Sequence, residues 1–363
     1  MKKTKTIIIT GNHHTPAIEL IKQLKNSSNF KWHIYYIAHK NDTKTHIENI
    51  IINEQNIQVF NIECGKFDRR IILKTLKGLP LIVKGFSSAL KIINRIKPDI
   101  IISFGGYVSV PVIIAGFIKK IPSITHEQTL TLSLSTKINS FFTNKVALSF
   151  DIKDTSLPKN KTILTGNLIR SDIFKNDTLL FNKININKFP LVYVTGGNQG
   201  SNFINKTIFS LLPELTKHYH IIHQTGQLDY KSASKIDIPN YFPIEYIDSK
   251  NIGWIFHHAS LIISRSGANI CQEIHLFNKN SILIPHPYTQ QNEQLKNALW
   301  LKNLQPKNTI IHDQNHTKPD TLLASIKQII GQKNVNHINK ISQNIKLLSL
   351  IENLVLTKNN KTR

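Results

Sequence analysis

Cysteine is nearly absent from this sequence of 363 residues, and acidic residues are scarce. Cys64 and Cys271 are too few and too far apart for a disulfide framework or a zinc site. The sequence has no Asp-x-Asp pair and no His-Glu-x-x-His motif, so familiar signatures of a catalytic metal are missing. We therefore expect no metal and no cofactor, and we expect helix ends and basic side chains to neutralise any bound phosphate.

Long apolar runs are also missing. The stretch 111–118 is among the longest, and it is far short of the ~20 residues that span a bilayer. The basic N-terminus is followed by only three isoleucines, 7–9, before a polar turn, which is not a secretory signal. These features predict a cytoplasmic protein.

Basic residues dominate what is present. The chain has 46 Lys and Arg against 22 Asp and Glu, which gives a net charge of +24. Such a chain favours anionic partners: nucleic acid, anionic lipid or phosphorylated small molecules. The abundance of Asn, Lys and Ile equally fits a compositional bias. We expect no nucleic acid, because no basic and aromatic platform of the RNA-binding kind is evident.

Short apolar segments alternate with helical patterns along the whole chain, which predicts an α/β protein with parallel sheets. Two such series predict two Rossmann-like domains, at 1–170 and 189–334, joined by a polar linker at 171–188. A helix is expected within 335–363, from its apolar spacing, and it could return to the first domain. The predicted strands are Thr6–Ile9, His33–Ala38, Val59–Ile62, Asp99–Phe104, Ser123–His126, Val146–Phe150, Thr162–Leu164, Leu191–Thr195, Ile221–Gln224, Ile244–Tyr246, Leu261–Ser264, Ser281–Pro285 and Thr309–His312.

Glycine-bearing turns follow four of these strands, two in each half. They lie at 10–12, 105–107, 196–200 and 266–268. A tight turn between a strand and a helix offers backbone N–H groups and a helix N-terminus to a phosphate group. The sequence therefore predicts anion binding at these turns.

Ordered motifs around these turns resemble the MurG family of UDP-N-acetylglucosamine transferases, from residue 6 to about residue 298. They are "TGNHHTPA" (10–17), "GGYVSVP" (105–111), "HEQT" (126–129), "TGNLIR" (165–170), "GGNQGS" (196–201), "RSGANICQE" (265–273) and "QLKNA" (294–298). Val110, Thr129 and Asn198 replace a glycine, an asparagine and a serine of the family pattern. Ile8, Ile9 and Asn12 stand where the family has glycines.

The resemblance implies a GT-B fold, with two Rossmann-like domains facing each other across a cleft. It also implies inverting transfer of N-acetylglucosamine from UDP-N-acetylglucosamine to an undecaprenyl-diphosphate-linked muramoyl-peptide, converting lipid I to lipid II in peptidoglycan synthesis. The departures at the glycine turns leave open another glycolipid acceptor. A basic binding protein on a decayed transferase scaffold is the remaining alternative.

The resemblance also assigns residues to the two substrates. Glu273 would accept hydrogen bonds from the ribose, Gln294 would contact the donor sugar, and the backbone of Ile247 would read uracil. Arg170 and Asn198 would contact phosphate, and Thr129 the sugar. The implied donor set is Thr10, Gly11, Asn12, Thr129, Arg170, Asn198, Ile247, Ser266, Gly267, Ala268, Asn269, Ile270, Cys271, Gln272, Glu273 and Gln294. The implied acceptor set is Gly105, Gly106, Tyr107 and Ser109.

Two candidates could remove the proton from the acceptor hydroxyl. Histidine has a suitable pKa for a general base, and His13 stands in the family register. Glu127 could instead orient or replace that base, and the sequence does not choose between them. We expect His14 to point away as a solvated turn residue.

Residues 66–99 interleave Lys and Arg with Ile, Leu, Val and Phe. Such a segment fits either a core helix pair with solvated lysines or a surface on an anionic membrane. The lipid-linked acceptor implied by the resemblance favours membrane contact, at the cytoplasmic face of the cell membrane.

Overall fold

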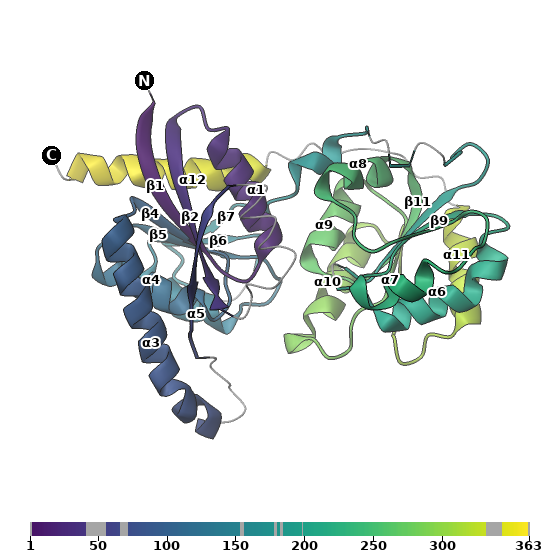
Figure 1. Ribbon diagram of the computed structural model, residues 1–363, viewed down its shortest axis with the longest axis horizontal. Helices are drawn as coiled ribbons and strands as arrows, with labels where there is room; N and C mark the ends of the chain where they lie inside the picture. The colour runs from purple at the N-terminus through teal and green to yellow at the C-terminus, as the bar shows by residue number, and fades with distance from the viewer. Residues whose placement is uncertain are drawn as a thin grey trace. The chain divides into compact units, whose positions relative to one another are not determined.

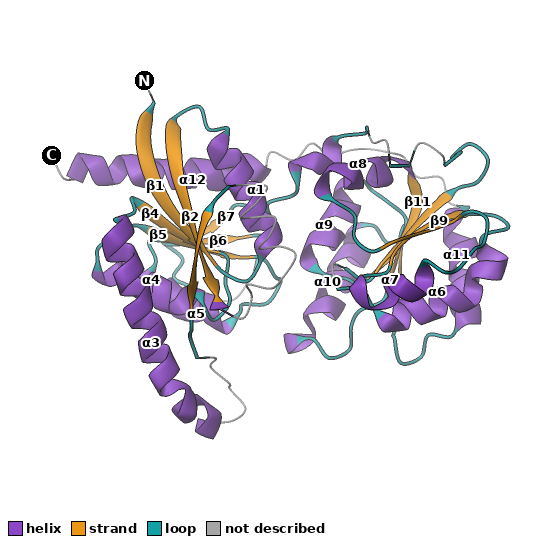
Figure 2. Ribbon diagram, viewed as in Figure 1, coloured by secondary structure: helices purple, strands orange, loops and turns teal. Residues whose placement is uncertain are grey.

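The computed structural model describes residues 2–40, 56–65, 72–152, 156–177, 180–181, 184–197, 199–331 and 343–361. It divides into two compact units (Figure 1). The first unit is Met1–Leu168 with Ser342–Arg363, and the second is Ile169–Ile341. Each unit is an α/β layer structure built on a parallel sheet (Figure 2).

The described part of the first unit holds a sheet in the order β3-β2-β1-β4-β5-β6-β7. Its strands are β1 (Lys3–Thr10), β2 (Phe30–His39), β3 (Gln58–Ile62), β4 (Ile100–Ser103), β5 (Ser123–Glu127), β6 (Lys145–Leu148) and β7 (Thr162–Leu164). Its helices are α1 (His14–Lys25), α3 (Ile72–Ile96), α4 (Ser109–Ile118), α5 (Leu134–Phe142) and α12 (Gln343–Lys361).

Helices cover both faces of this sheet, which explains why its strands are apolar on both sides. Successive side chains of β1 point to opposite faces. Ile7 and Ile9 join the core made with α1 and α12, whereas Ile8 joins the core made with α3 and α4. The C-terminal helix α12 therefore belongs to the first unit, where Leu347, Ile351 and Val355 are buried.

The described part of the second unit holds a sheet in the order β10-β9-β8-β11-β12-β13. Its strands are β8 (Leu191–Thr195), β9 (His220–Gln224), β10 (Tyr241–Ile244), β11 (Ala259–Ser264), β12 (Ser281–Leu283) and β13 (Thr309–Ile311). Its helices are α6 (Asn202–Leu215), α7 (Gln227–Ala233), α8 (Ser249–His258), α9 (Ala268–Leu276), α10 (Glu293–Leu304) and α11 (Pro319–Ile330), with the 3-10 turns η3 (Ser171–Phe174) and η4 (Gln290–Asn292).

The two faces of this sheet again pack on different helices. Val192 and Val194 of β8 face α6 and α11, while Leu191 and Tyr193 face the core that α8, α9 and α10 contribute. Each predicted strand position is occupied by a strand. The strand expected at 244–246 lies instead at Tyr241–Ile244 and contains Pro243. Proline is tolerated there because β10 is at the edge of the sheet.

Residues 171–188, expected as a linker, belong to the second unit. The described part of this segment contributes Ile173, Phe181 and Ile184 to the core, where the Phe181 ring stacks on Trp254. These apolar side chains are spaced among many polar residues. The overall composition of the segment is therefore typical of a linker, although part of it is buried. The chain passes from the first unit to the second after Leu168.

Candidate functional site

All four glycine turns lie at the two places where strand order reverses. In the first sheet, β2 and β3 extend from one side of β1, and β4 begins the other side. In the second sheet, β8 and β11 are the corresponding pair. Parallel α/β sheets bind ligands at the carboxyl ends of the strands that flank this switch point. The turns after β1, β4, β8 and β11 occupy that location in each unit.

The two turns of the first unit interlock. The Asn12 N–H donates to the Gly105 carbonyl at 3.3 Å. A Cβ on Gly11 would lie 2.7 Å from the Phe104 carbonyl carbon, and one on Gly106 would lie 2.6 Å from Cγ of Asn12. Both glycines also have positive φ, 132° and 79°. Both positions favour glycine because of the positive φ and the close contacts: Gly11 lies against the backbone of the other turn, and Gly106 lies against the Asn12 side chain.

His13 lies at the N-cap of α1 and keeps solvent access. A Cβ on Gly105 would lie 3.6 Å from the His13 ring, so the ring lies over the turn that follows β4. Desolvation by the surrounding protein lowers the pKa of His13, and the charge of Glu127 opposes that shift. The imidazole is therefore neutral at lower pH than an ordinary histidine.

His14 is half-buried beside Tyr36. Its Nδ1 lies 3.3 Å from the hydroxyl of Tyr36, and that buried hydroxyl donates to the Gly11 carbonyl at 2.7 Å. The side chain is less solvated than expected because β2 brings Tyr36 beside the turn, and its orientation away from the acceptor stays a prediction. Tyr36 is one of the residues that sequence reasoning missed.

The turn after β11 leads directly into α9. The Cys271 N–H donates to the Gly267 carbonyl at 3.1 Å, across the start of α9. The N–H groups before it lie in the first turn, where the helix itself supplies no acceptor. A Cβ on Gly267 would meet no atom within 4 Å. The protein leaves open space there, at an end of α9 that favours anions.

Glu273 lies on α9 behind this turn and is only 2% exposed. The Nε and Nη2 atoms of Arg170 donate to its two carboxylate oxygens at 2.8 and 2.6 Å. Burial lowers the pKa of Arg170, but the adjacent carboxylate outweighs burial, so the net pKa is raised. The two residues assigned to ribose and phosphate thus form one bidentate ion pair within the second unit.

Gln294 and Asn297 come from α10 on the other side of the turn. The Ser266 hydroxyl donates to the Gln294 carbonyl at 2.8 Å, and the Asn297 side chain donates to the Ser266 carbonyl at 3.0 Å. The side-chain oxygen of Gln294 accepts the His286 N–H at 2.9 Å. Within the described residues its side-chain nitrogen has no partner, and it carries two N–H donors suited to hydroxyl groups.

The sequence matches the glycosyltransferase family 28 N-terminal domain over residues 6–148 and the C-terminal domain of that family over residues 191–354. Two curated relatives are named UDP-N-acetylglucosamine–N-acetylmuramyl-(pentapeptide) pyrophosphoryl-undecaprenol N-acetylglucosamine transferase. The protein from Clostridium perfringens is 34% identical over 336 residues, which is 91% of each chain. The protein from Lachnospira eligens is 32% identical over 347 residues, 92% of this chain and 94% of the relative.

The chain belongs to the MurG family. The crystal structure of Acinetobacter baumannii MurG superposes with a TM-score of 0.66 at 20% identity, covering 96% of this chain and 99% of the other. A UDP-GlcNAc 2-epimerase from Neisseria meningitidis, solved with UDP-GlcNAc bound, gives a TM-score of 0.63 at 14% identity, covering 96% and 100%. These likenesses show the GT-B fold in both units.

The MurG motif that begins at His126 forms a closed hydrogen-bonded loop. The Glu127 carboxylate accepts from the N–H groups of Gln128, Thr129 and Ser133 and lies within reach of the Thr129 and Ser133 hydroxyls, at 2.8–3.2 Å. All of these donors belong to its own loop. The Thr129 hydroxyl lies within the same loop, 3.0 Å from that carboxylate.

The backbone N–H groups of the MurG glycine turn after β4 also have hydrogen-bond partners within the first unit. The Gly105 N–H donates to the Ser103 hydroxyl and the Gly106 N–H to the Ser135 hydroxyl, both at 3.1 Å. Ser109 is buried, and its hydroxyl donates to the Gly106 carbonyl at 2.8 Å. These two N–H groups are therefore engaged, and this turn differs from a preformed phosphate cradle.

Several other predicted residues have supporting positions. Thr10 is buried and donates to the Ile37 carbonyl at 2.9 Å. The Tyr107 ring packs edge-on against His39. Ile247 has its side chain in the core of the second unit, as Cys271 does. Asn198 lies outside the described residues.

Arg265, at the start of a MurG motif, is the main supporting residue that sequence reasoning passed over. Its Nη1 donates to the Ile284 carbonyl at 2.9 Å, and its Nη2 lies 2.7 Å from the Ser201 hydroxyl and 2.6 Å from Oε1 of Gln314. Burial lowers the pKa of Arg265 to about 10. Arg265 links the turn after β11 to the N-cap of α6. Its position directly before Ser266 in the motif is the sequence feature that could have indicated this role.

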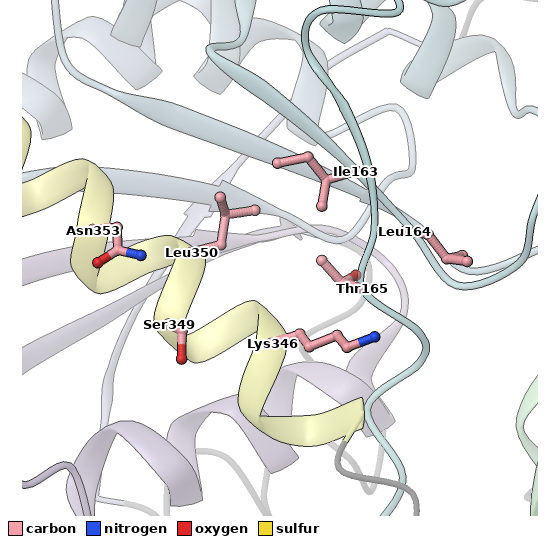
Figure 3. A pocket seen from close by; sticks show the side chains of 7 residues that line it. All are labelled: Ile163, Leu164, Thr165, Lys346, Ser349, Leu350 and Asn353. Atoms are coloured by element: carbon pink, nitrogen blue, oxygen red, sulfur yellow. The ribbon is translucent and has the colours of Figure 1, made fainter.

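A cavity of about 370 Å³ lies elsewhere in the first unit, between β7 and α12 (Figure 3). Its lining is mostly apolar, and Lys346 is its one basic group. None of the residues assigned to either substrate lines it. In the part of the chain that the structure describes, no helix is both long and apolar enough to cross a membrane.

Proposed function

We propose that this chain transfers N-acetylglucosamine from UDP-N-acetylglucosamine to an undecaprenyl-diphosphate-linked muramoyl-peptide, converting lipid I to lipid II. The observation that carries the proposal is the turn at Ser266 and Gly267, with an open α9 N-terminus, a buried Glu273 behind it and Gln294 beside it. The MurG relatives, aligned over about nine tenths of the chain, support the same reaction.

The donor is assigned to the second unit. The N–H groups that begin α9 would receive the diphosphate, since a helix N-terminus carries partial positive charge and N–H groups for which the helix itself supplies no acceptor. Glu273 would accept both ribose hydroxyls, Gln294 would bind hydroxyls of the sugar, and the Ile247 backbone would bind uracil. Ser266 and Asn297 hold the turn to α10 and keep these groups in place.

The transfer step needs a base for the acceptor hydroxyl. His13 takes that proton while the hydroxyl oxygen forms a bond to the anomeric carbon of the donor sugar. The bond between that carbon and the β-phosphate oxygen breaks, and UDP leaves with the electron pair. We assign the base to His13 because, within the described residues, the Glu127 carboxylate is bound by donors of its own loop. His13 keeps solvent access and has a lowered pKa.

We propose that the first unit contacts the cytoplasmic face of an anionic membrane. Three large apolar side chains at the ends of α4 and α5 are exposed: Phe117 (53%), Ile118 (55%) and Phe141 (70%). We call these three residues the α4–α5 patch. The two helices meet beside it, where Phe117 packs on Phe142 with ring centroids 5.4 Å apart. Lys119 and Lys120 follow directly and are exposed. Apolar side chains flanked by lysines suit a headgroup layer.

The segment 66–99, predicted to make this contact, is described in part. Residues 66–71 lie outside the described residues, and side chains of α3 are described from Pro80 onward. Leu81 and Val83 are exposed on α3, which packs on α4, so this helix can extend the surface. Lys84 is paired with Glu63.

The donor site is tested by thermal unfolding with nucleotides. UDP should raise the melting temperature without added divalent metal, ADP should not, and Glu273→Ala should reduce the UDP shift. Incorporation of labelled N-acetylglucosamine into lipid I then tests the reaction. A UDP shift that appears only with magnesium or manganese would contradict the site, and transfer to another glycolipid alone would identify a different acceptor.

A further inference from the structure

Hydroxyl groups join the turn after β4 to the segment that follows β5. The Gly106 N–H donates to the Ser135 hydroxyl at 3.1 Å, and Oγ of Ser135 lies 3.0 Å from Oγ of Ser133. Oγ of Ser133 lies 2.8 Å from Oε2 of Glu127. Ser135 and Glu127 are both buried. A backbone N–H group, two hydroxyls and a carboxylate thus form an unbroken chain of hydrogen bonds.

The number of protons fixes the direction of this chain, because each serine has only one O–H group. The Ser133 hydroxyl can donate to Glu127 at 2.8 Å or to Oγ1 of Thr136 at 3.0 Å. The carboxylate is the stronger acceptor because it is charged. With the Ser133 proton on Glu127, the bond between the two serines requires Ser135 as the donor. Ser135 therefore accepts from Gly106 and donates to Ser133, so every donor points toward the carboxylate.

The chain ends at the turn that lies beside His13. Hydrogen bonds that share one direction polarise one another, so the carboxylate strengthens the bond made by the Gly106 N–H. A Cβ on Gly105 would lie 3.6 Å from the His13 ring and 3.7 Å from Oγ of Ser135. The ring and the Ser135 hydroxyl therefore border the same space over the turn. A shift of this turn would change the surface that the base faces.

We propose that Ser133 and Ser135 are positioning residues for the acceptor, which carry the hold of the Glu127 carboxylate to the turn after β4. They act through Gly106 and not on the reacting atoms. The inference rests on the proposed function, and it gives Glu127 a task other than proton removal: its charge anchors the chain that keeps the turn beside His13.

The first test reads the chain without an activity assay. Protein labelled with ¹⁵N-glycine allows the amides of its 15 glycines to be followed by NMR. Ser135→Ala should move the Gly106 amide proton upfield, because its acceptor is lost. Ser133→Ala should cause a smaller upfield shift, because the Ser135 hydroxyl then loses the acceptor that polarises it. The Gly105 amide, which donates to the Ser103 hydroxyl, is the internal reference.

The second test measures transfer to a lipid-linked acceptor. Ser135→Ala should lower kcat/KM for the acceptor about tenfold, the loss expected from one buried hydrogen bond, and should leave KM for UDP-N-acetylglucosamine unchanged. Ser135→Thr keeps the hydroxyl and should recover at least part of the loss. Ser140→Ala is the matched control, because Ser140 is a buried serine of α5 whose hydroxyl donates to the Lys137 carbonyl of the same helix.

Melting temperatures show whether each variant is folded. Ser133 also caps α5, so Ser135→Ala carries the activity test. An unchanged Gly106 signal in Ser133→Ala would show that the two serines are not coupled, and near-normal acceptor kinetics in folded Ser135→Ala would overturn the positioning role. A wild-type protein that transfers to no lipid-linked acceptor would instead contradict the proposed function, while the Gly106 signals would still decide whether the chain exists.

Discussion

At the scale of single residues, the two adjacent histidines have separate surroundings. His13 faces solvent over the turn after β4, whereas His14 contacts Tyr36 behind the turn. Tyr36 in turn holds the Gly11 carbonyl. The family pattern has glycines near this turn, and this chain has Ile8, Ile9 and Asn12. The hydroxyl of Tyr36 adds support to a turn that carries larger side chains.

We predict that His13→Ala lowers turnover by about 10²–10⁴-fold, the usual contribution of a general base, and leaves UDP binding unchanged. Tyr36→Phe should lower turnover less, because it removes one hydrogen bond to Gly11 and not the base itself. Assays with a lipid-linked acceptor measure turnover, and calorimetry measures UDP affinity. His33→Ala, an exposed histidine on β2, is the control. Near-normal turnover in His13→Ala would show that another residue acts as the general base.

The pH dependence follows from the same residue. The base acts when neutral, and the pKa of His13 is lowered from the ordinary value of 6.5. Activity limited by His13 should therefore persist below pH 6.5 and decline only as pH falls through the lowered pKa. An acid limb of kcat/KM centred above 6.5 would be inconsistent with this assignment.

At the scale of elements, glycines in the turns serve different purposes. Gly200 has a φ of 82°, and a Cβ there would overlap the Thr225 carbonyl oxygen, so the turn after β8 packs directly on the turn after β9. Gly267 has an ordinary φ of −64°, and a Cβ there would meet no atom within 4 Å. Protein packing requires glycine at the first position only. At Gly267 we propose that a ligand approaching the backbone is the reason for glycine.

We predict that Gly200→Ala lowers the melting temperature, because the added methyl group displaces backbone and positive φ disfavours alanine. Gly267→Ala should leave the melting temperature unchanged and weaken UDP more than uridine, because the methyl group enters the diphosphate position. Differential scanning fluorimetry and ligand titration separate the two effects. Gly331→Ala, with open space around it and no assigned role, should change neither. Equal losses for UDP and uridine in Gly267→Ala would place the diphosphate elsewhere.

At the scale of the whole molecule, the charge of +24 favours anionic surfaces, and the exposed α4–α5 patch supplies apolar side chains to insert into one. We predict sedimentation with vesicles rich in phosphatidylglycerol, weaker at high salt because exposed charges are screened. Phe117→Ser with Phe141→Ser should reduce binding at every salt concentration, and Lys119→Glu with Lys120→Glu should mainly reduce its salt-sensitive part. Leu228→Ser, an exposed apolar residue of the second unit, is the control. Unchanged partition of both double variants would leave the patch as ordinary surface.

The sequence by itself determined the α/β class, the positions of the strands, and the family. Local patterns carry that information, because apolar strands, glycine turns and motif spacing are written in consecutive residues. It also indicated Glu273, Gln294 and His13, whose motifs are contiguous.

Only the tertiary structure decided which of these groups meet. Arg170 and Glu273 are 103 positions apart, and their pairing depends on how the chain enters the second unit. Tyr36 reaches Gly11 because β1 and β2 are neighbours, which no local pattern states. The serine hydroxyls that occupy the Gly105 and Gly106 N–H groups come from β4 and α5. A hydrogen bond needs atoms about 3 Å apart, and the sequence specifies such distances only through the fold.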